Sequence, residues 1–153
     1  MKPLELKIPP PLVTLACAAL AWGLSAPGVG WHLPAGPRLV GAGLCLLLGA
    51  VLTLWALGLF RRARTTASPL QPGRSRALVR EGPYRFTRNP MYLGLALLLL
   101  ALCLWLGDVL ALLALVVFVA WITRFQILPE ERALQERFGP AYTQYRQEVR
   151  RWL

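Results

Sequence analysis

The 153-residue chain has few of the side chains that hold metal ions or disulfides. It contains one histidine, His32, and three cysteines, Cys17, Cys45 and Cys103. A single histidine leaves no Cys/His ligand spacing, so we expect no metal site. The cysteines all lie inside apolar runs, and an odd number at such positions argues against a disulfide framework. We interpret them as small buried hydrophobic residues.

Acidic residues are also scarce. The chain has 7 Asp and Glu against 17 Lys and Arg, which gives a formal net charge of +10. Such a balance suits either nucleic acid or anionic lipid. The basic residues stand at the ends of long apolar runs, 56% of the residues are hydrophobic and the mean hydropathy is +0.50. These features favour membrane lipids as partners, and we expect no nucleic-acid partner. The length suits a single domain over residues 1–153.

Four apolar runs predict transmembrane helices at about residues 12–27, 39–60, 90–106 and 109–127. The second run is the clearest, because it is long enough to span a hydrocarbon core of about 30 Å and contains no charged residue. The first run could also be the apolar part of a signal peptide. Prolines precede it and its cleavage site is weak, so we interpret it as a retained helix.

Eight arginines lie between residues 61 and 88. By the positive-inside rule, the loop 61–89 is cytoplasmic, and with two spans on either side both termini are cytoplasmic as well. The sequence therefore predicts an all-α, multi-pass integral membrane bundle of about four transmembrane helices, in a bacterial inner membrane.

The C-terminal residues 129–153 are polar and differ from the apolar runs before them. We expect Pro129 to break the chain after the fourth span. Beyond it, apolar and aromatic residues recur at helical spacing, and Gly139-Pro140 interrupts the pattern. This predicts two short amphipathic helices, which Arg146, Arg150 and Arg151 would keep on the cytoplasmic side.

A polar segment enters the third span. It reads LVREGPYRFTRNPMYLG over residues 78–94. The third and fourth spans are joined by a tight turn at Gly107-Asp108, so their opposite ends must be neighbours. This topology brings together Arg85, Arg88, Asn89, Tyr92, Glu130 and Glu131.

Adjacent carboxylates beside an apolar bundle are costly to leave unpaired. Glu130 and Glu131 could simply pair with Arg85 or Arg88. Alternatively, one carboxylate binds the amino or hydroxyl groups of a ligand while the arginines bind its carboxylate. A ligand with both groups and an apolar or aromatic part is typical of a cofactor derived from an amino acid.

Two motifs resemble the integral-membrane methyltransferases. Residues 82–94 read GPYRFTRNPMYLG, and residues 129–153 read PEERALQERFGPAYTQYRQEVRRWL. They are similar to the R-H-P-x-Y-x-G, E-E-x-x-L and F-G-x-x-Y-x-x-Y motifs of isoprenylcysteine carboxyl methyltransferases and phospholipid N-methyltransferases. The resemblance covers roughly the C-terminal half. It implies methyl transfer from S-adenosylmethionine to a lipophilic acceptor, either a phospholipid amine or an isoprenoid or prenylcysteine-like carboxylate, at the cytoplasmic face.

The resemblance also implies site residues. Glu131, Arg88 and Tyr92 are the expected catalytic residues, and Arg124 and Gln126 the expected substrate residues. The expected cofactor-binding residues surround the start of the third span and the end of the fourth: Leu78, Val79, Gly82, Tyr84, Arg85, Arg88, Asn89, Pro90, Tyr92, Gly94, Glu130, Glu131 and Leu134.

This chain departs from the family pattern at two positions. Asn89 stands where many members have histidine, and an amide can still donate and accept hydrogen bonds. Gln126 stands where the prenylcysteine enzymes have an arginine, with Arg124 two residues earlier. Because a neutral amide grips a carboxylate less well than a guanidinium does, the prenylcysteine acceptor is weakened more than the cofactor. A general base for an amine acceptor would then be a carboxylate.

Two other functions stay open on the sequence. Membrane sterol reductases resemble the same C-terminal half and use NADPH, although they are much longer. A small membrane scaffold whose arginines grip anionic headgroups would need no pocket at all. Copurification of an adenosyl compound, a nicotinamide or neither would distinguish these alternatives.

Overall fold

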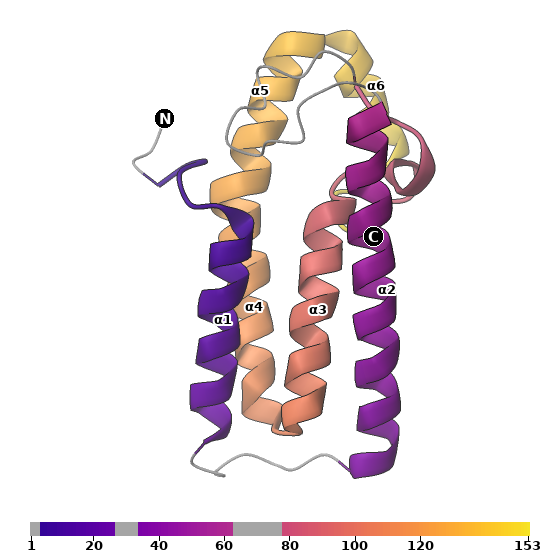
Figure 1. Ribbon diagram of the computed structural model, residues 1–153. Helices are drawn as coiled ribbons and strands as arrows, with labels where there is room; N and C mark the ends of the chain where they lie inside the picture. Colours follow the sequence, from indigo (N-terminus) through magenta and orange to yellow (C-terminus); the bar gives the residue numbers. More distant parts are fainter. Residues whose placement is uncertain (1–3, 27–33, 63–77) are drawn as a thin grey trace.

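The computed structural model describes residues 4–26, 34–62 and 78–153, and in these ranges every regular element is helical. Helices α1 (Pro10–Ser25), α2 (Ala35–Arg62), α3 (Pro90–Leu106) and α4 (Leu112–Ile122) run alongside one another (Figure 1). Helix α5 (Leu128–Phe138) continues the line of α4 past the bundle, and α6 (Pro140–Glu148) turns back from it. The all-α prediction is confirmed.

Two helical stretches, Ala35–Leu59 and Val109–Phe138, are long and apolar enough to cross a membrane. The predicted first and third spans correspond to the shorter apolar helices Pro10–Ser25 and Pro90–Leu106. The count of four spans, the sidedness of the termini and the single domain stay predictions. Much of the predicted loop 61–89 lies outside the described residues, as does His32.

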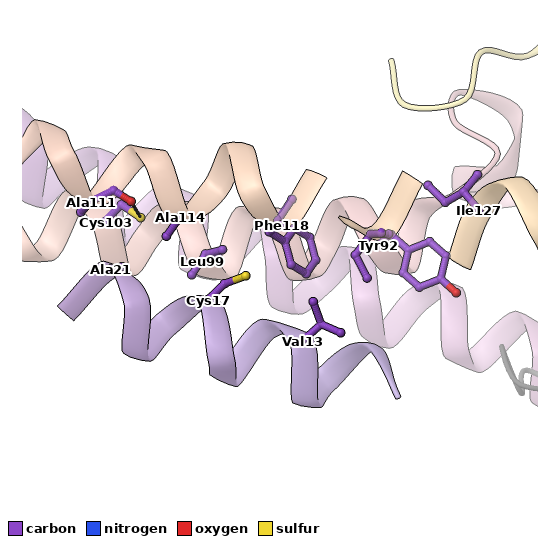
Figure 2. Close-up of a cluster of buried hydrophobic side chains, with 12 residues drawn as sticks. Val13, Cys17, Ala21, Tyr92, Leu99, Cys103, Ala111, Ala114, Phe118 and Ile127 are labelled. Atoms are coloured by element: carbon purple, nitrogen blue, oxygen red, sulfur yellow. Dashed lines mark hydrogen bonds between the residues drawn. The ribbon is translucent and has the colours of Figure 1, made fainter. Parts of the chain in front are cut away.

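Helix α3 occupies the centre of the bundle. Side chains of α1, α3 and α4 form one buried cluster, in which Phe118 and Ile122 are fully buried (Figure 2). On its other side α3 lies against α2, where a Cβ placed on Gly94 would stand 2.1 Å from Thr53 Oγ1 and 2.9 Å from the Gly49 carbonyl oxygen. Glycine at this point permits the close crossing of two apolar helices.

The α3–α4 hairpin closes as the sequence predicted. Gly107 ends α3 with a φ of 80°, a left-handed conformation that glycine adopts without strain. Asp108 then accepts a hydrogen bond from the Leu110 backbone N–H, at 2.8 Å. Arg38 of α2 donates to the carbonyl oxygens of Leu104 and Trp105 at this end of α3. The turn brings the opposite ends of the two helices together.

The predicted break at Pro129 is wrong. The helix runs from α4 through a π-helical turn, Thr123–Ile127, into α5, and Pro129 lies in the first turn of α5. Proline has no N–H for the carbonyl four residues earlier, and the wider π turn accommodates that loss without ending the helix. The carbonyl oxygen of Phe125 instead accepts the backbone N–H of Leu6, at 3.0 Å. The interruption between α5 and α6, where Gly139 has a φ of 50°, agrees with the sequence.

Candidate functional site

The candidate site lies at the end of the bundle where α3 begins and α5 leaves α4. The segment before α3 contains a short 3₁₀ turn, Gly82–Arg85, and reaches Pro90 in the first turn of α3. Gly82 has a φ of 58°, and a Cβ there would stand 2.8 Å from Leu59 Cδ1 of α2. Glycine therefore lets this segment pass close to α2 before entering α3.

Glu131 is the most heavily paired group of the site. Its side chain is buried and forms a salt bridge with Arg88, whose Nη2 lies 2.9 Å from Glu131 Oε1. Arg151 binds the same carboxylate through both oxygens, with Nε at 3.0 Å from Oε1 and Nη2 at 2.9 Å from Oε2. Two guanidiniums thus share one buried carboxylate. This contact raises the pKa of Arg151, so Arg151 stays charged.

Glu130 has a different environment from its neighbour. Its carboxylate accepts a hydrogen bond from the Tyr92 hydroxyl, at 2.5 Å. Tyr92 is buried and lies beside Ile127 at one end of the core cluster (Figure 2). Within the described ranges, no salt bridge to Glu130 is found. The adjacent carboxylates are therefore unequal: Glu131 is balanced by cations, and Glu130 has a neutral partner.

Arg88 carries the most informative atoms of the site. Its side chain is only 8% exposed, and one nitrogen, Nη2, binds Glu131. Its Nε and Nη1 are buried without a hydrogen-bond partner among the described residues. Unpaired buried donors are rare in proteins and cost free energy, above all in a charged group. Each of these two unpaired nitrogens suits a ligand that brings a carboxylate or another oxygen acceptor.

The C-terminal tail is bound to the segment that precedes α3. The backbone N–H of Arg88 donates to the Arg150 carbonyl oxygen at 3.0 Å. The Arg151 carbonyl oxygen accepts from Asn89 Nδ2 at 2.9 Å and from Thr87 Oγ1 at 3.2 Å. The Asn89 side chain thus holds the tail in place through its amide.

A cluster of aromatic and apolar side chains around α6 contacts the segment that precedes α3. Tyr145 donates to the Tyr84 carbonyl oxygen at 2.7 Å, and the Arg80 guanidinium lies 5.4 Å from the centre of the Tyr145 ring. Burial, followed by the nearby Glu131 carboxylate, raises the pKa of Tyr142 to about 12. Burial likewise raises the pKa of Tyr84. The phenols therefore stay neutral at physiological pH. The cluster comprises Tyr142, Tyr145, Val149, Leu78, Leu134 and Phe138.

The remaining expected residues lie in several places. Arg85 is exposed and makes no described contact with either glutamate, so the structure does not bring it into the site. Pro90 is buried where α3 begins, and Gly94 lies at the crossing of α2 and α3. Val79 is partly buried in the segment before the 3₁₀ turn.

The two residues expected to contact substrate are both bound by the N-terminal segment. Gln126 is fully buried and donates through Nε2 to the Ile8 carbonyl oxygen at 2.6 Å. Arg124 Nη1 lies 3.3 Å from Glu5 Oε1, and Arg132 Nη2 lies 2.6 Å from Glu5 Oε2. Among the described residues, no group of three or more His, Cys, Asp or Glu could hold a metal ion.

Sequence reasoning missed two residues that organise this end of the molecule. From the sequence, the charge of Arg151 predicted only the side of the membrane. In the structure Arg151 binds both oxygens of the Glu131 carboxylate. Glu5 stands alone in the N-terminal segment, and no local pattern singles it out. The sequence signal for Arg151 was weak: an Arg-Arg pair at residues 150–151 that follows the adjacent glutamates 130–131 only after two short helices.

A model of the phospholipid methyltransferase family matches residues 37–141. The match covers more than half of the 153 residues. The chain belongs to the phospholipid methyltransferase family. The expected kinship with membrane methyltransferases is confirmed, and the matched region contains Arg88, Tyr92, Glu130 and Glu131.

The chain is also similar to an uncharacterized protein of Haemophilus influenzae. The two are 52% identical over 63 residues, which is 41% of this chain and 100% of the relative. No solved structure matches. Together with its apolar helices, family membership makes this a membrane protein and an enzyme of a methyltransferase family whose substrates are membrane lipids.

Proposed function

We propose that this protein transfers a methyl group from S-adenosylmethionine to the amine of a phospholipid head group. Family membership supports the reaction class. The observation that carries the cofactor assignment is Arg88, an almost fully buried guanidinium with two N–H donors that lack an acceptor among the described residues. A bound cofactor with a carboxylate would supply that acceptor.

The residues present fit the cofactor's chemical groups. Arg88 would hold the carboxylate of its methionine part through one of its unpaired nitrogens, Nε or Nη1, in a charge-assisted hydrogen bond. Glu131 holds Arg88 in place at 2.9 Å. The aromatic cluster around Tyr142 offers an apolar wall to the rest of the molecule. When bound, the cofactor supplies an already activated methyl group.

The chain's own task is to align the acceptor and to remove a proton from it. A phospholipid ammonium must lose a proton before its nitrogen can accept a methyl group. We assign that role to Glu130, because Glu131 is neutralised by two guanidiniums while Glu130 has only the Tyr92 hydroxyl as partner. Tyr92 orients the carboxylate. The buried surroundings keep water away from the reacting atoms.

The cofactor assignment is tested by calorimetric titration of the detergent-purified protein with S-adenosylmethionine and S-adenosylhomocysteine. We expect micromolar binding that weakens about tenfold or more in Arg88→Gln, the loss typical of a charged hydrogen bond. Arg85→Gln is the matched control, since it removes a charge from the same segment at an exposed position. Absence of binding by a folded wild-type protein would reject the proposal, and binding of NADPH instead would identify a reductase.

The acceptor and the base are tested by incorporation of a labelled methyl group in vesicles. Vesicles containing phosphatidylethanolamine should be labelled, and vesicles of phosphatidylglycerol should not. Glu130→Gln should retain cofactor binding while its turnover falls about a hundredfold, the scale of general-base catalysis. Equal labelling of both lipids would overturn the amine acceptor, and full turnover by Glu130→Gln would overturn the base.

A further inference from the structure

A shallow, open apolar hollow, called the trough below, lies along α4, the π-helical turn and the start of α5. Its volume is about 520 Å³. All of its lining comes from the continuous stretch of α4, the π-helical turn and α5, and only Thr123 and Arg124 at one end are polar. The lining residues are Leu115, Val116, Val119, Ala120, Thr123, Arg124 and Leu128.

The polar end of the trough is cationic. The Arg124 side chain is 38% exposed, and its described salt bridge is to Glu5, at 3.3 Å. Glu5 also binds Arg132, at 2.6 Å, so a single carboxylate is shared by two guanidiniums. Two positive charges against one negative charge leave the end of the trough attractive to an anion. An apolar floor with a cationic end matches the chemistry of a phospholipid, which has an acyl chain and a phosphate.

The trough is also adjacent to the paired carboxylates. Thr123 Oγ1, at its polar end, accepts a hydrogen bond from the indole N–H of Trp152 at 3.2 Å. The preceding residue, Arg151, binds Glu131 at 2.9 Å. Two consecutive residues of the C-terminal tail therefore separate the trough from the site. A lipid whose phosphate bound Arg124 would therefore have its amine close to the C-terminal residues 151–152 and to the site that they adjoin.

We propose that this trough binds an acyl chain of the phospholipid acceptor and that Arg124 binds its phosphate. The inference rests on the proposed function and gives one of the expected substrate residues, Arg124, a defined role in it. Arg124 recognises a lipid phosphodiester, and a lipid with the same chains but no phosphate is held less well. Gln126 takes no part, because its amide is turned inward and bonded to Ile8.

The test is direct titration of the detergent-purified protein with fluorescent phosphatidylethanolamine and with fluorescent diacylglycerol of the same chains. We expect the wild type to prefer phosphatidylethanolamine by about tenfold, the contribution of one charge-assisted contact. Arg124→Gln should abolish this preference. Arg146→Gln, which removes a charge from an exposed position on α6, should keep it.

A second pair of variants tests the trough itself. Ala120→Trp fills the trough and should weaken the binding of both lipids about tenfold. Val117→Trp places the same bulk on an exposed position of α4 that does not line the trough, and should change neither affinity. Equal effects of the two tryptophans would mean that lipid merely surrounds the helix, and would overturn the proposal. So would dissociation of a dimer by Ala120→Trp without a change in lipid binding, which would make a second copy the occupant.

The titration needs neither cofactor nor turnover, so it separates the two proposals. Specific lipid binding without binding of S-adenosylhomocysteine would refute the proposed function and leave the trough supported. Cofactor binding together with a wild type that does not distinguish the two lipids would refute the trough alone.

Discussion

Both ends of the chain bind the same helical stretch through the same charge arrangement, one carboxylate shared by two arginines. At the N-terminal end Glu5 joins Arg124 and Arg132, and at the C-terminal end Glu131 joins Arg88 and Arg151. The arrangements differ in burial. Both carboxylates are buried, and the difference lies in the arginines: Arg124 and Arg132 are 38% and 56% exposed and Arg151 is 34% exposed, whereas Arg88 is 8% exposed.

The arginines of the N-terminal cluster are accessible to water, whereas Arg88 of the C-terminal cluster is buried. Water satisfies the remaining donors of the exposed arginines Arg124 and Arg132, although the Glu5 carboxylate between them is buried. A buried guanidinium has no water to accept its hydrogen bonds. In the described part of the chain, Arg88 retains two donor nitrogens without partners. The C-terminal cluster is therefore arranged around a buried ligand, whereas the N-terminal cluster fastens the chain across the π-helical turn and leaves Arg124 accessible from outside.

The largest effect is expected for Glu131→Gln. It leaves the buried Arg88 without its counter-ion, and removal of one partner from a buried pair costs about 3 kcal/mol. Thermal unfolding in detergent, followed by circular dichroism, should show a strongly lowered midpoint, and calorimetry should show loss of cofactor binding. A variant as stable as the wild type would contradict the assigned role of this cluster.

Arg151→Gln should have a smaller effect on the same cluster. The salt bridge of Arg88 with Glu131 survives, so cofactor affinity should fall by less than tenfold, in line with one partly exposed charged contact. The tail should loosen, because Arg151 holds it against Glu131, and limited proteolysis should detect faster cleavage after residue 149. A loss of affinity equal to that of Glu131→Gln would mean that the tail, and not Arg88, contacts the cofactor.

Glu5→Gln tests the N-terminal cluster in the same way. Glu5 is buried, with its side chain 2% exposed, but its arginine partners Arg124 and Arg132 stay hydrated, so the loss of stability should be smaller than for Glu131→Gln. Cofactor affinity should be unchanged, since Glu5 has no described contact with Arg88 or Glu131. A change in the calorimetric affinity of this variant would show that the two clusters are coupled through α5.

The smallest effect concerns Tyr142, which lies within the influence of Glu131. Its pKa is raised to about 12, so the folded state keeps a proton that the unfolded chain loses near pH 10. The stabilisation from this group is complete below about pH 10 and disappears as the pH rises through about 12. Tyr142→Phe should therefore move alkaline unfolding upward by some tenths of a pH unit, with no change below pH 9. An identical alkaline transition in the two proteins would place the Tyr142 hydroxyl in contact with water.

Part of the site could be predicted from the sequence, because a single tight turn between α3 and α4 decides which residues meet. Gly107-Asp108 closes α3 onto α4, and this places Arg88 and Tyr92 beside the two glutamates whatever else the chain does. Arg85 shows the limit of that reasoning. It lies in the same segment, but the 3₁₀ turn leaves it exposed, because its orientation depends on how the backbone packs against α2 and α6.

The sequence alone determined the helices, their apolar character and the meeting of Arg88 with Glu131, because these depend on local patterns and on one short hairpin. Tertiary structure decided which carboxylate is neutralised, which donors stay unpaired and where the helix bends. The contacts responsible join Glu5 to Arg124, Leu6 to Phe125 and Arg151 to Glu131. The first two pair residues 119 positions apart in the chain, a separation that no local pattern encodes. Such contacts form only once packing has brought distant segments together.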